Sequence, residues 1–473
     1  MLGIVSYSGY IPYYRLKKET TGQAFGKKGG KGAKAVAYCD EDSVTMAVAA
    51  AIDAVKNTNV DEIGAVYFAS TTSPYAEKQS ATQIAAALDL GEMIRTGDFA
   101  NSLRANSTAL LAGRDAAAAD GKKVLVTFSD CRTGAPEGKF EDELGDAAAA
   151  FLLGSENVLA EINYRVSVSK DAVDEWRADD DKFVRFWDVR YAAAALYGPL
   201  VKKAVDAVLA QSLLKPSDFA KMIIYGHDDK IRTSLALKLG FTSEQIVPSY
   251  YGEIGNTGNA AAGLMLCKAL EDAKPGDRLL FVTYGEGADA IILTATDNIT
   301  GFTPSRTISQ LIGYKDDSLP YGKYLKWKGI ISTEPQRRPA QERSSLPDYY
   351  RNYKKNNALY GSRCKKCGTI VFPPQRICVH CGAADEFELY SLRDKTAVVK
   401  TFTIDGLSIS MDSPNIVVDI EFEGGGKMLN YLVDCNKDNV KVGMKVRPSF
   451  RKLFEVNGNS TYFWKVVPVH EEV

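Results

Sequence analysis

The sequence predicts an α/β layered fold, followed by a zinc ribbon and a small β-barrel. Three observations support this prediction. From residue 1 to about residue 300, short apolar strands alternate with alanine-rich helical stretches. Four cysteines then follow with the spacing C-x2-C-x10-C-x2-C. After them, β-rich runs separated by glycine turns continue to the C-terminus, a pattern typical of a barrel of OB type.

Length and composition limit the class of protein. The chain has 473 residues, of which 45% are hydrophobic and 25% charged, as expected for a globular protein of several domains. A formal net charge of -1 gives no overall field that would recruit nucleic acid or an anionic membrane. No run of about 18 apolar residues occurs, and the N-terminus MLGIVSYSGYIP reads as a strand rather than a signal peptide. We therefore expect no nucleic acid or membrane as partner.

The first 300 residues divide into two related halves, residues 1–170 and 171–300, because strand and helix alternate in the same order in both. The apolar runs predict strands at 64–70, 123–129, 221–226 and 278–285. The alanine-rich runs predict helices at 43–55, 82–90, 107–119, 198–214 and 259–273. The lysine- and glycine-rich segment 15–34 is predicted to be a loop.

The remaining residues form three further segments. Residues 301–345 are rich in Pro, Arg and Gln in their second half and predict a linker or an extended wrapping segment. Residues 346–390 contain the cysteine motif, and residues 391–473 carry the strands of the predicted barrel. The chain is therefore predicted to consist of five segments.

The four cysteines of the motif predict a structural Zn²⁺ site. Cys364, Cys367, Cys378 and Cys381 supply four thiolates, and a glycine follows each pair where a tight turn is needed. A closed site of four cysteines leaves no coordination position for water or substrate, so the metal should hold the fold rather than perform chemistry. The ribbon thiols must stay reduced to bind metal, and the other four cysteines are scattered, which fits a reducing cytoplasm.

Several segments together resemble a known superfamily. They are GIVSYSGYIPYYRL at the start, DEDSVTMAVAAAIDA, STTSPYAEKQSATQIAAALDL, ELGDAAAAFLLG, GEIGNTGNAAAGLML and YGEGADAIIL. Their order and spacing resemble the hydroxymethylglutaryl-CoA synthase and type III ketoacyl synthase branch of the thiolase superfamily. The ribbon followed by a β-rich tail is similar to the zinc-ribbon and OB-fold module that accompanies thiolase-superfamily enzymes.

The resemblance implies a fold and a chemistry. The fold would be the duplicated five-layered αβαβα thiolase fold. The substrate would be an acyl-CoA or acyl-carrier thioester, with a carbon–carbon bond made or broken next to the thioester carbonyl. The usual groups of the superfamily are a nucleophilic cysteine at the start of a helix, a histidine, and an asparagine or second histidine. Members are commonly homodimers, and a thiolase partner is a further possibility for this chain.

Two residues match the catalytic positions of the family. His227 follows a predicted strand and precedes a helical run, and it is a candidate general acid or base. Asn256, in the turn EIGNTGN, matches a position whose side chain donates a hydrogen bond to the thioester oxygen in an oxyanion hole. The alternative for each is structural: a buried histidine, or an asparagine in a turn.

The expected nucleophile is missing. Alignment of NSLRANSTALLAG with the cysteine-bearing helix start of the family places Leu103 at the nucleophile position, and leucine cannot be acylated. Ser102 lies one residue out of register, and Cys131 is more typical of a small buried thiol. Thr71 occupies the place of the general-base glutamate of the synthases. Both usual agents of hydroxymethylglutaryl-CoA synthesis are thus absent.

Three functions remain open. The first is an aldolase-type or lyase-type reaction on a β-hydroxyacyl-CoA, which needs a base and enolate donors but no acyl-enzyme. Its further candidate bases are Tyr284, Glu286 and Tyr191, which the sequence does not rank. The second is a Claisen-type acyltransferase with Ser102 or Cys131 as a displaced nucleophile. The third is a non-catalytic scaffold subunit of a thiolase complex.

Binding of the CoA phosphates is a separate question. Lysine and arginine are the residues that favour phosphate contacts. The lysine-rich segment 15–34 and Arg190 are the candidates, and a solvated loop is the alternative.

Overall fold

The computed structural model describes residues 1–334, 345–407 and 410–469. Within them the chain forms two compact units. The first comprises Met1–Ala37, Asp42–Ala85 and Leu90–Tyr321, and the second comprises Tyr38–Glu41, Ala86–Asp89 and the described part of Gly322–Val473. None of the described helices is long and apolar enough to cross a membrane. The finer boundaries at residues 170, 300, 345 and 390 stay predictions.

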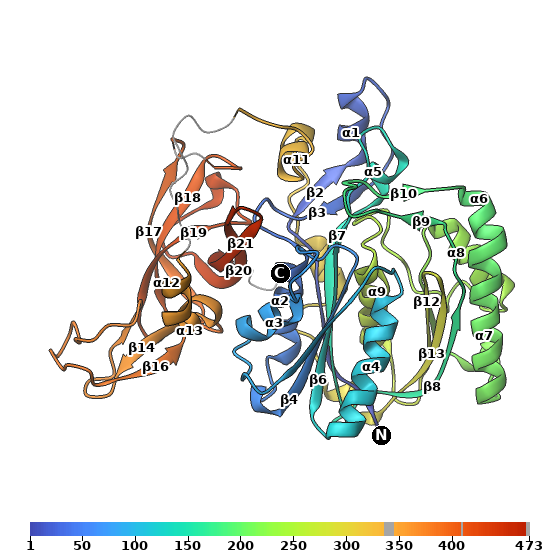
Figure 1. The fold of residues 1–473 in the computed structure, drawn as a ribbon, viewed down its shortest axis with the longest axis horizontal. Helices are drawn as coiled ribbons and strands as arrows, with labels where there is room; N and C mark the ends of the chain where they lie inside the picture. Colours follow the sequence, from blue (N-terminus) through green and yellow to red (C-terminus); the bar gives the residue numbers. More distant parts are fainter. Residues whose placement is uncertain (335–344, 408–409, 470–473) are drawn as a thin grey trace. The chain divides into compact units, whose positions relative to one another are not determined.

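A nine-stranded sheet runs through the first unit in the order β11-β12-β13-β8-β1-β7-β6-β4-β5 (Figure 1). Its strands are β1 (Gly3–Tyr10), β4 (Ile63–Ser70), β5 (Arg95–Ala100), β6 (Lys123–Cys131), β7 (Asp146–Gly154), β8 (Ala160–Ser169), β11 (Lys221–Ile224), β12 (Arg278–Tyr284) and β13 (Gly287–Ala295). Strand β4 is parallel to β6, and β7 is antiparallel to both β6 and β1.

The second half of the sheet repeats this arrangement. Strand β11 is parallel to β12, and β13 is antiparallel to both β12 and β8. The two halves are joined by the antiparallel pair β1 and β8. The predicted duplication and all four strands predicted from apolar runs are therefore confirmed.

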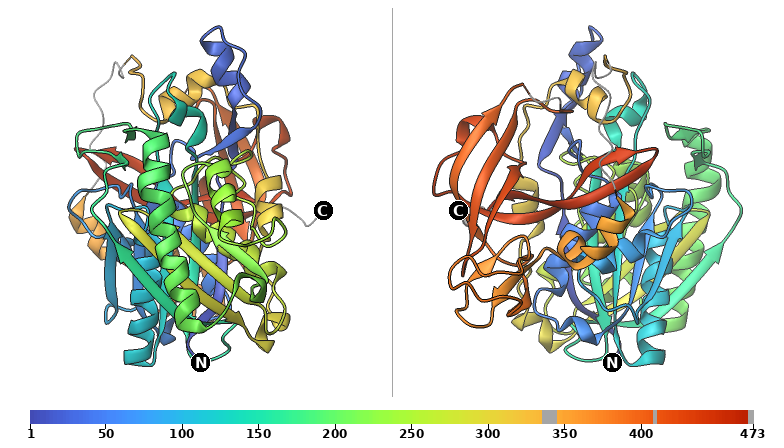
Figure 2. Two further views of the ribbon diagram at one scale, coloured as in Figure 1. Left: turned by 90° about the vertical axis from the view of Figure 1, so that its right-hand side faces the viewer. Right: turned by 60° about the vertical axis from the view of Figure 1, so that its left-hand side comes forward.

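Helices cover both halves of the sheet and fill the space between them (Figures 1 and 2). The main helices of this unit are α2 (Ser43–Val55), α3 (Ser80–Ala87), α4 (Ala105–Asp120), α7 (Gly198–Ser212), α8 (Asp229–Lys238) and α9 (Asn259–Asp272). Helix α2 packs on the first half of the sheet and α7 on the second. Helices α4 and α9 pack against each other and against the strands, which gives five layers.

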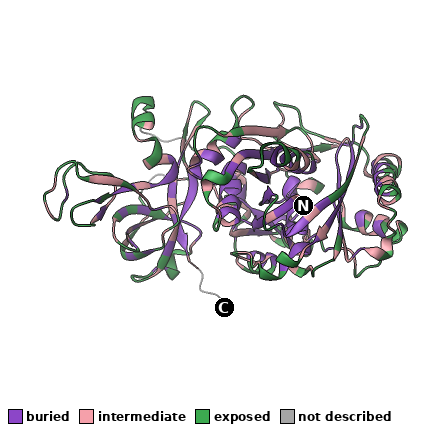
Figure 3. Ribbon diagram, turned by 90° about the horizontal axis from the view of Figure 1, so that it is seen from below, coloured by how far each residue is buried: buried purple, intermediate pink, exposed green. Residues whose placement is uncertain are grey.

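Burial explains why these segments fold as they do. Every residue of β7 is buried, and so is every residue of α9 from Asn259 to Leu270 except Lys268. Such continuous apolar runs are expected of elements covered on both sides. Figure 3 shows the buried residues gathered in the interior of the sheet and its inner helices, whereas the outer faces are exposed. The head of α2 is fixed by a capping box between Asp42 and Thr45.

The lysine- and glycine-rich segment is not the simple loop that the sequence predicted. It contains the hairpin of β2 (Tyr14–Lys17) and β3 (Ala33–Val36), with the short helix α1 (Lys18–Ala24) between the strands. The two strands pair along their length, from Tyr14 with Val36 to Lys17 with Ala33. Residues 15, 16, 35 and 36 are buried. Tertiary pairing between strands separated by 15 residues is invisible to local composition, which explains the error.

The second unit contains the ribbon and the barrel. The ribbon strands are β14 (Tyr360–Cys364), β15 (Ile370–Val371) and β16 (Phe387–Ser391), preceded by α12 (Leu346–Arg351) and α13 (Tyr353–Ala358). The barrel is closed in the order β17-β18-β19-β21-β20. Its strands are β17 (Ala397–Asp405), β18 (Asn415–Phe422), β19 (Lys427–Leu432), β20 (Lys445–Val456) and β21 (Asn459–Pro468). Five closed strands confirm the predicted barrel.

The predicted linker 301–345 begins with two short helices, α10 (Ile308–Gly313) and α11 (Tyr321–Trp327). A capping box between Thr307 and Gln310 marks the start of α10. Residues 335–344 of the predicted linker lie outside the described residues.

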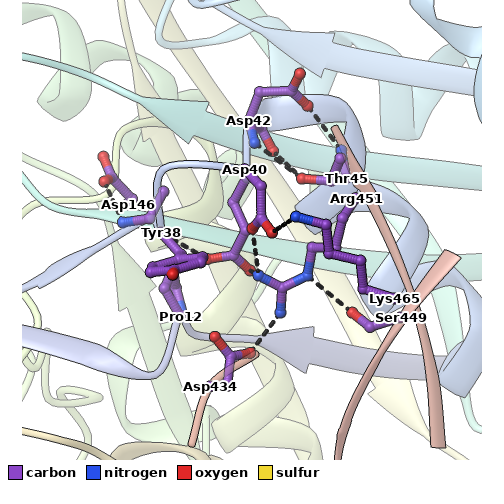
Figure 4. Close-up of polar contacts among 12 residues, drawn as sticks. Pro12, Tyr38, Asp40, Asp42, Thr45, Asp146, Asp434, Ser449, Arg451 and Lys465 are labelled. Atoms are coloured by element: carbon purple, nitrogen blue, oxygen red, sulfur yellow. Dashed lines mark hydrogen bonds and ion pairs between the residues drawn. The ribbon is translucent and has the colours of Figure 1, made fainter. Parts of the chain in front are cut away.

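A buried cluster of charges links the segment Tyr38–Glu41 to the barrel strands of the same unit (Figure 4). Arg451 of β20 is 1% exposed, and it forms ion pairs with Asp40 at 3.1 Å, with Glu41 at 3.2 Å and with Asp434. Lys465 of β21 adds a second bond to Asp40 at 2.7 Å. Burial acts to raise the pKa of Asp40, but the two cations outweigh it and hold this pKa below its usual value.

Replacement of Arg451 by methionine should destabilise the barrel by about 3 to 5 kcal/mol, because three buried carboxylates then lose their guanidinium partner. Amide hydrogen exchange over β20 and β21, followed by mass spectrometry, measures the effect. The control is Lys441→Met, since Lys441 is exposed on the same unit. Equal protection in the two variants would contradict the assigned role of Arg451.

Candidate active site

His227 lies in the loop between β11 and α8 of the first unit. Asp228, the next residue, caps α8 by accepting hydrogen bonds from the backbone N–H groups of Lys230 and Ile231. The His227 side chain is 14% exposed, and its Nδ1 lies 2.7 Å from Glu175 Oε2. The other ring nitrogen, Nε2, lies 3.6 Å from Asp174 Oδ2. Carboxylates thus face both nitrogens, an arrangement that orients an imidazole for proton transfer.

The two carboxylates are themselves held by further partners. Tyr284 donates a hydrogen bond of 2.6 Å to Asp174, and Arg132 forms an ion pair with Glu175. Burial acts to raise the pKa of Asp174, but the bonds and charge of His227 and the Tyr284 bond lower it below its usual value. Asp174 therefore stays ionised beside the imidazole. Burial and the Asp174 charge raise the pKa of Tyr284 far above its usual range, so its hydroxyl remains a donor.

Aromatic rings enclose the imidazole on several sides. The ring centroids of Phe186, Tyr225 and Tyr284 lie 5.4, 6.0 and 5.7 Å from that of His227, all in edge-on arrangements. A cavity of about 20 Å³ opens beside His227, lined also by Asp174, Phe186 and Tyr197. Room of this size accommodates a water-sized group next to the imidazole.

Asn256 lies in the loop before α9, where its side-chain oxygen accepts two hydrogen bonds. The donors are the backbone N–H of Gly258 at 3.0 Å and the hydroxyl of Tyr225 at 3.3 Å. These two bonds orient the Asn256 amide, whose NH₂ group is the part that can donate a hydrogen bond. Since Tyr225 also packs on His227, one aromatic side chain links the two predicted residues. Their catalytic roles stay predictions.

Gly258 is required by the turn that holds Asn256. Its φ of 59° and ψ of -126° are disfavoured for residues with a Cβ. A Cβ at this position would lie 2.3 Å from the Asp130 carboxylate. Only glycine therefore allows this loop to approach Asp130.

Asp130 is fully buried at the end of β6 and joins the surrounding loops. Its Oδ1 accepts hydrogen bonds from Ser70, from the backbone and side chain of Thr71, and from Thr72. Its Oδ2 accepts two bonds from Asn259, at the head of α9. Thr71, which occupies the expected position of the general-base glutamate, thus serves as a donor to Asp130. Neither Thr71 nor Asp130 is available as a base.

The expected nucleophile position is apolar in the structure. Leu103 is 8% exposed, belongs to the hydrophobic core and lies directly before Arg104, the N-cap residue of α4. Its neighbour Ser102 donates a hydrogen bond of 2.6 Å to Glu286, in the turn between β12 and β13. Cys131 is partly buried, and its backbone N–H donates to Thr72.

Other predicted residues lie apart from this cluster. Tyr191, in the short helix α6 (Val189–Ala192), is 68% exposed, and the neighbouring Arg190 is also exposed. A cavity of about 560 Å³ lies at the β2–α1–β3 segment, and its lysines are Lys17, Lys28, Lys31 and Lys315. Its acidic residues are Glu19, Glu253 and Asp317. The segment predicted to contact phosphate therefore lines a polar cavity with four lysines, and Arg190 is not part of its lining.

Sequence reasoning missed Asp174, Glu175, Arg132 and Tyr225. The two acids lie in and beside the two-residue strand β9 (Glu175–Trp176), which pairs with β10 (Arg185–Phe186). They belong to a polar stretch, DAVDEWRADDDK, in which six acidic residues look alike. No local signal separates the two that face His227 from the four that do not.

The four ribbon cysteines form a metal centre in the second unit. Their sulfur atoms all lie within 4.8 Å of one another, with 3.5 Å between Cys367 and Cys378 and 3.7 Å between Cys364 and Cys381. A tetrahedral Zn²⁺ with bonds of about 2.3 Å places its sulfurs about 3.8 Å apart. The donor set therefore fits zinc, and the site is structural because all four positions are taken by protein thiols.

Three stretches of the sequence match known domain families. Residues 351–388 match the ChsH2 rubredoxin-like zinc ribbon domain, and residues 392–451 match the ChsH2 C-terminal OB-fold domain. Residues 209–294 match the 3-oxoacyl-[acyl-carrier-protein] synthase III C-terminal domain.

Two whole proteins are similar to this chain over nearly all of their own length. The chain is 32% identical over 344 residues to a hydroxymethylglutaryl-CoA synthase of Caldivirga maquilingensis, covering 70% of this chain and 98% of that protein. It is 34% identical over 343 residues to the corresponding protein of Aeropyrum pernix, covering 70% and 94%. Among solved structures, an HMG-CoA synthase complexed with CoA has a TM-score of 0.58 at 20% identity, covering 69% of this chain and 89% of that one. The structural likeness supports the thiolase-type fold.

Removal of zinc by a chelator should unfold the ribbon and leave the nine-stranded sheet folded, because the binding energy of a structural zinc is folding energy. Hydrogen exchange should rise over β14, β15 and β16, while β4 and β6 keep their protection. Cys378→Ser should have the same effect without chelator. Cys435→Ser is the control, since Cys435 lies outside the cluster. A ribbon that stays protected after its metal is gone would contradict the structural role of zinc.

Proposed function

This chain belongs to the hydroxymethylglutaryl-CoA synthase family, and from that membership we propose that it acts on an acyl-CoA as a carbon–carbon lyase or aldolase. Enzymes of this family and its superfamily act on thioesters, and one of the similar structures is complexed with CoA. The substrate we propose is a β-hydroxyacyl-CoA. The proposal rests on the predicted match of Leu103 to the nucleophile position of the synthases, and it is supported by the burial of Leu103 directly before the N-cap residue of α4.

The proposed reaction needs no covalent intermediate. A base removes the proton of the β-hydroxyl group, and the bond between Cα and Cβ breaks. The hydroxyl carbon leaves as an aldehyde or ketone, and the bonding electrons pass to the thioester as an enolate. Protonation of the enolate carbon gives the shortened acyl-CoA. The step requires a base, an acid and hydrogen-bond donors to the enolate oxygen.

The cluster around His227 contains groups suited to these roles. His227 serves as an acid or base, supported by its contacts with Asp174 and Glu175. Asn256 serves as a donor to the enolate oxygen, supported by the two hydrogen bonds that orient its amide. The CoA phosphates are proposed to bind at the lysine-bearing cavity of the β2–α1–β3 segment.

Since none of the eight cysteines is in a disulfide, we place this chemistry in the cytoplasm.

A second candidate function is Claisen-type acyl transfer with Ser102 as nucleophile. The observation that favours it is the hydrogen bond of 2.6 Å from Ser102 to the Glu286 carboxylate. A carboxylate in this position accepts the serine proton as the hydroxyl attacks a thioester, and CoA leaves as the thiol. Cys131 is the other nucleophile candidate, and its backbone N–H donates a hydrogen bond to Thr72.

The lyase proposal predicts that the protein shortens one or more members of a β-hydroxyacyl-CoA panel. His227→Ala should lower kcat about 100-fold or more, because proton transfer by a positioned side chain contributes about that much. Liquid chromatography with mass spectrometry measures the released acyl-CoA. The control is Lys238→Ala, an exposed residue at the far end of α8.

Intact mass spectrometry separates the two candidate functions. After incubation with acyl-CoA donors, the lyase should keep its unmodified mass. An acyl group located on Ser102 or Cys131 would contradict the lyase proposal and support acyl transfer. Unchanged turnover in His227→Ala would remove His227 from the mechanism.

The assembly is proposed to be a homodimer. Strand β5 is the last strand of the sheet and pairs only with β4 among the described strands, so its outer edge is a template for pairing with a second copy. Light scattering should give about twice the chain mass of 51.6 kDa, and Thr96→Pro on β5 should lower it. A monomer that cleaves no thioester until a thiolase-like protein is added would instead support the scaffold alternative.

A further inference from the structure

The turn between β12 and β13 places a glutamate in an unusual backbone conformation. Glu286 has a φ of 45°, in the left-handed region that residues with a Cβ rarely adopt. Such strain is retained where the surrounding structure holds the residue for a purpose. The preceding residue, Gly285, lies so close to the head of α4 that a Cβ would be 2.9 Å from Arg104 N and 3.0 Å from Ser102 Oγ. The turn therefore packs directly against the start of α4.

Arg104 clamps this turn in place. Its Nε donates to the carbonyl oxygen of Gly285 at 3.0 Å, and its Nη2 donates to that of Glu286 at 3.5 Å. The guanidinium is itself anchored by an ion pair of 3.1 Å with the buried Asp289. Because the backbone is held from α4 and from β13, the Glu286 carboxylate has a defined position and is not a mobile loop acid.

The carboxylate belongs to the same cluster as His227. Its Oε2 accepts the hydrogen bond from Ser102, and it is close enough to Asp174 and His227 to be affected by their charges. Burial raises the pKa of Glu286 above its usual value, and the Asp174 charge adds to this, whereas Ser102, Arg104 and His227 act in the opposite direction. A carboxylate with a raised pKa is a better base near neutral pH than an ordinary surface glutamate.

The other candidate bases are less suited to removing a hydroxyl proton. Tyr284 donates a hydrogen bond to Asp174, and a strongly raised pKa keeps its hydroxyl protonated. Tyr191 is exposed on α6. Asp130 is fully buried, and both of its oxygens are occupied by donors. Glu286 is therefore the carboxylate of this site that combines partial exposure with a fixed position.

We infer that Glu286 is the catalytic base that removes the substrate β-hydroxyl proton, with Ser102 as the residue that positions its carboxylate. The inference rests on the proposed lyase function. The proton passes from the hydroxyl oxygen to the Glu286 carboxylate as the bond between Cα and Cβ breaks. His227 supplies a proton to the enolate carbon, and water returns the Glu286 proton to His227 between turnovers. Protons and electrons balance without an oxidant or a further reactant.

The test is the pH dependence of kcat on the β-hydroxyacyl-CoA that the wild-type protein cleaves best. A base must be ionised to work, so on the acidic limb of the pH profile kcat should rise with pH through the Glu286 pKa. Glu286→Gln should lower kcat about 100-fold or more, leave KM within about threefold, and remove this acidic limb. The control is Glu244→Gln, an exposed carboxylate of the same unit.

Ser102→Ala supplies a second, independent readout. Its hydroxyl lowers the Glu286 pKa, so its loss should raise that pKa and move the acidic limb about 1 pH unit upward. The charged and titratable groups that face Glu286 and stay constant in this comparison are Asp174, His227, Arg104 and Tyr284.

The outcomes separate this inference from the function on which it rests. If the wild-type protein cleaves no member of the panel, the lyase function is overturned and the role of Glu286 with it. If the wild type is active and folded Glu286→Gln keeps both its rate and its acidic limb, the inference alone is overturned. Hydrogen exchange over β12 and β13 shows whether the variant is folded. If Glu286→Gln is misfolded, an unshifted limb in Ser102→Ala overturns the inference.

Discussion

The buried carboxylate of Asp130 is the constraint on which the site depends. A fully buried carboxyl group is tolerated only when its oxygens form hydrogen bonds, and here the loop after β4 and the start of α9 supply the donors. Asn259, one of these donors, also bonds to the carbonyl oxygen of Ser102 and to the backbone of Asn106 in α4. One buried carboxyl group, through Asn259, therefore connects the starts of both inner helices, α4 and α9, with the loops that carry Ser102 and Asn256.

The proposed chemistry follows from the proton-transfer groups that the site contains and from the nucleophile that it is expected to lack. Leu103 makes the start of α4 apolar, and His227 lies beside Asp174. In the proposed lyase reaction these side chains and Glu286 move protons around a carbon–carbon bond without an acyl-enzyme. The second unit uses different means of stabilisation. Its ribbon is held by four thiolates around zinc, and its barrel contains the buried cluster around Arg451.

Much of the architecture was predictable from local pattern. The helix at 43–55 was predicted to the residue, since alanine-rich periodicity begins directly after the capping Asp42. The barrel strands and the zinc ligands were equally visible, because alternation and cysteine spacing are local. The β2–β3 hairpin was not, since its strands are paired across a lysine- and glycine-rich stretch that reads as a loop.

For the candidate site too, some features were visible in the sequence and others only in the structure. By itself, the sequence determined that the chain has a duplicated α/β body, a four-cysteine zinc ribbon and a barrel, whereas the matches of His227, Asn256 and Leu103 to catalytic positions of the family stay predictions. Only the tertiary structure decided that Asp174 and Glu175 face His227, and that Ser102 is bonded to a glutamate 184 residues away. The physical reason is that spacing along the chain reports local geometry. The environment of a proton-transfer group is set by side chains that only the folded sheet brings together.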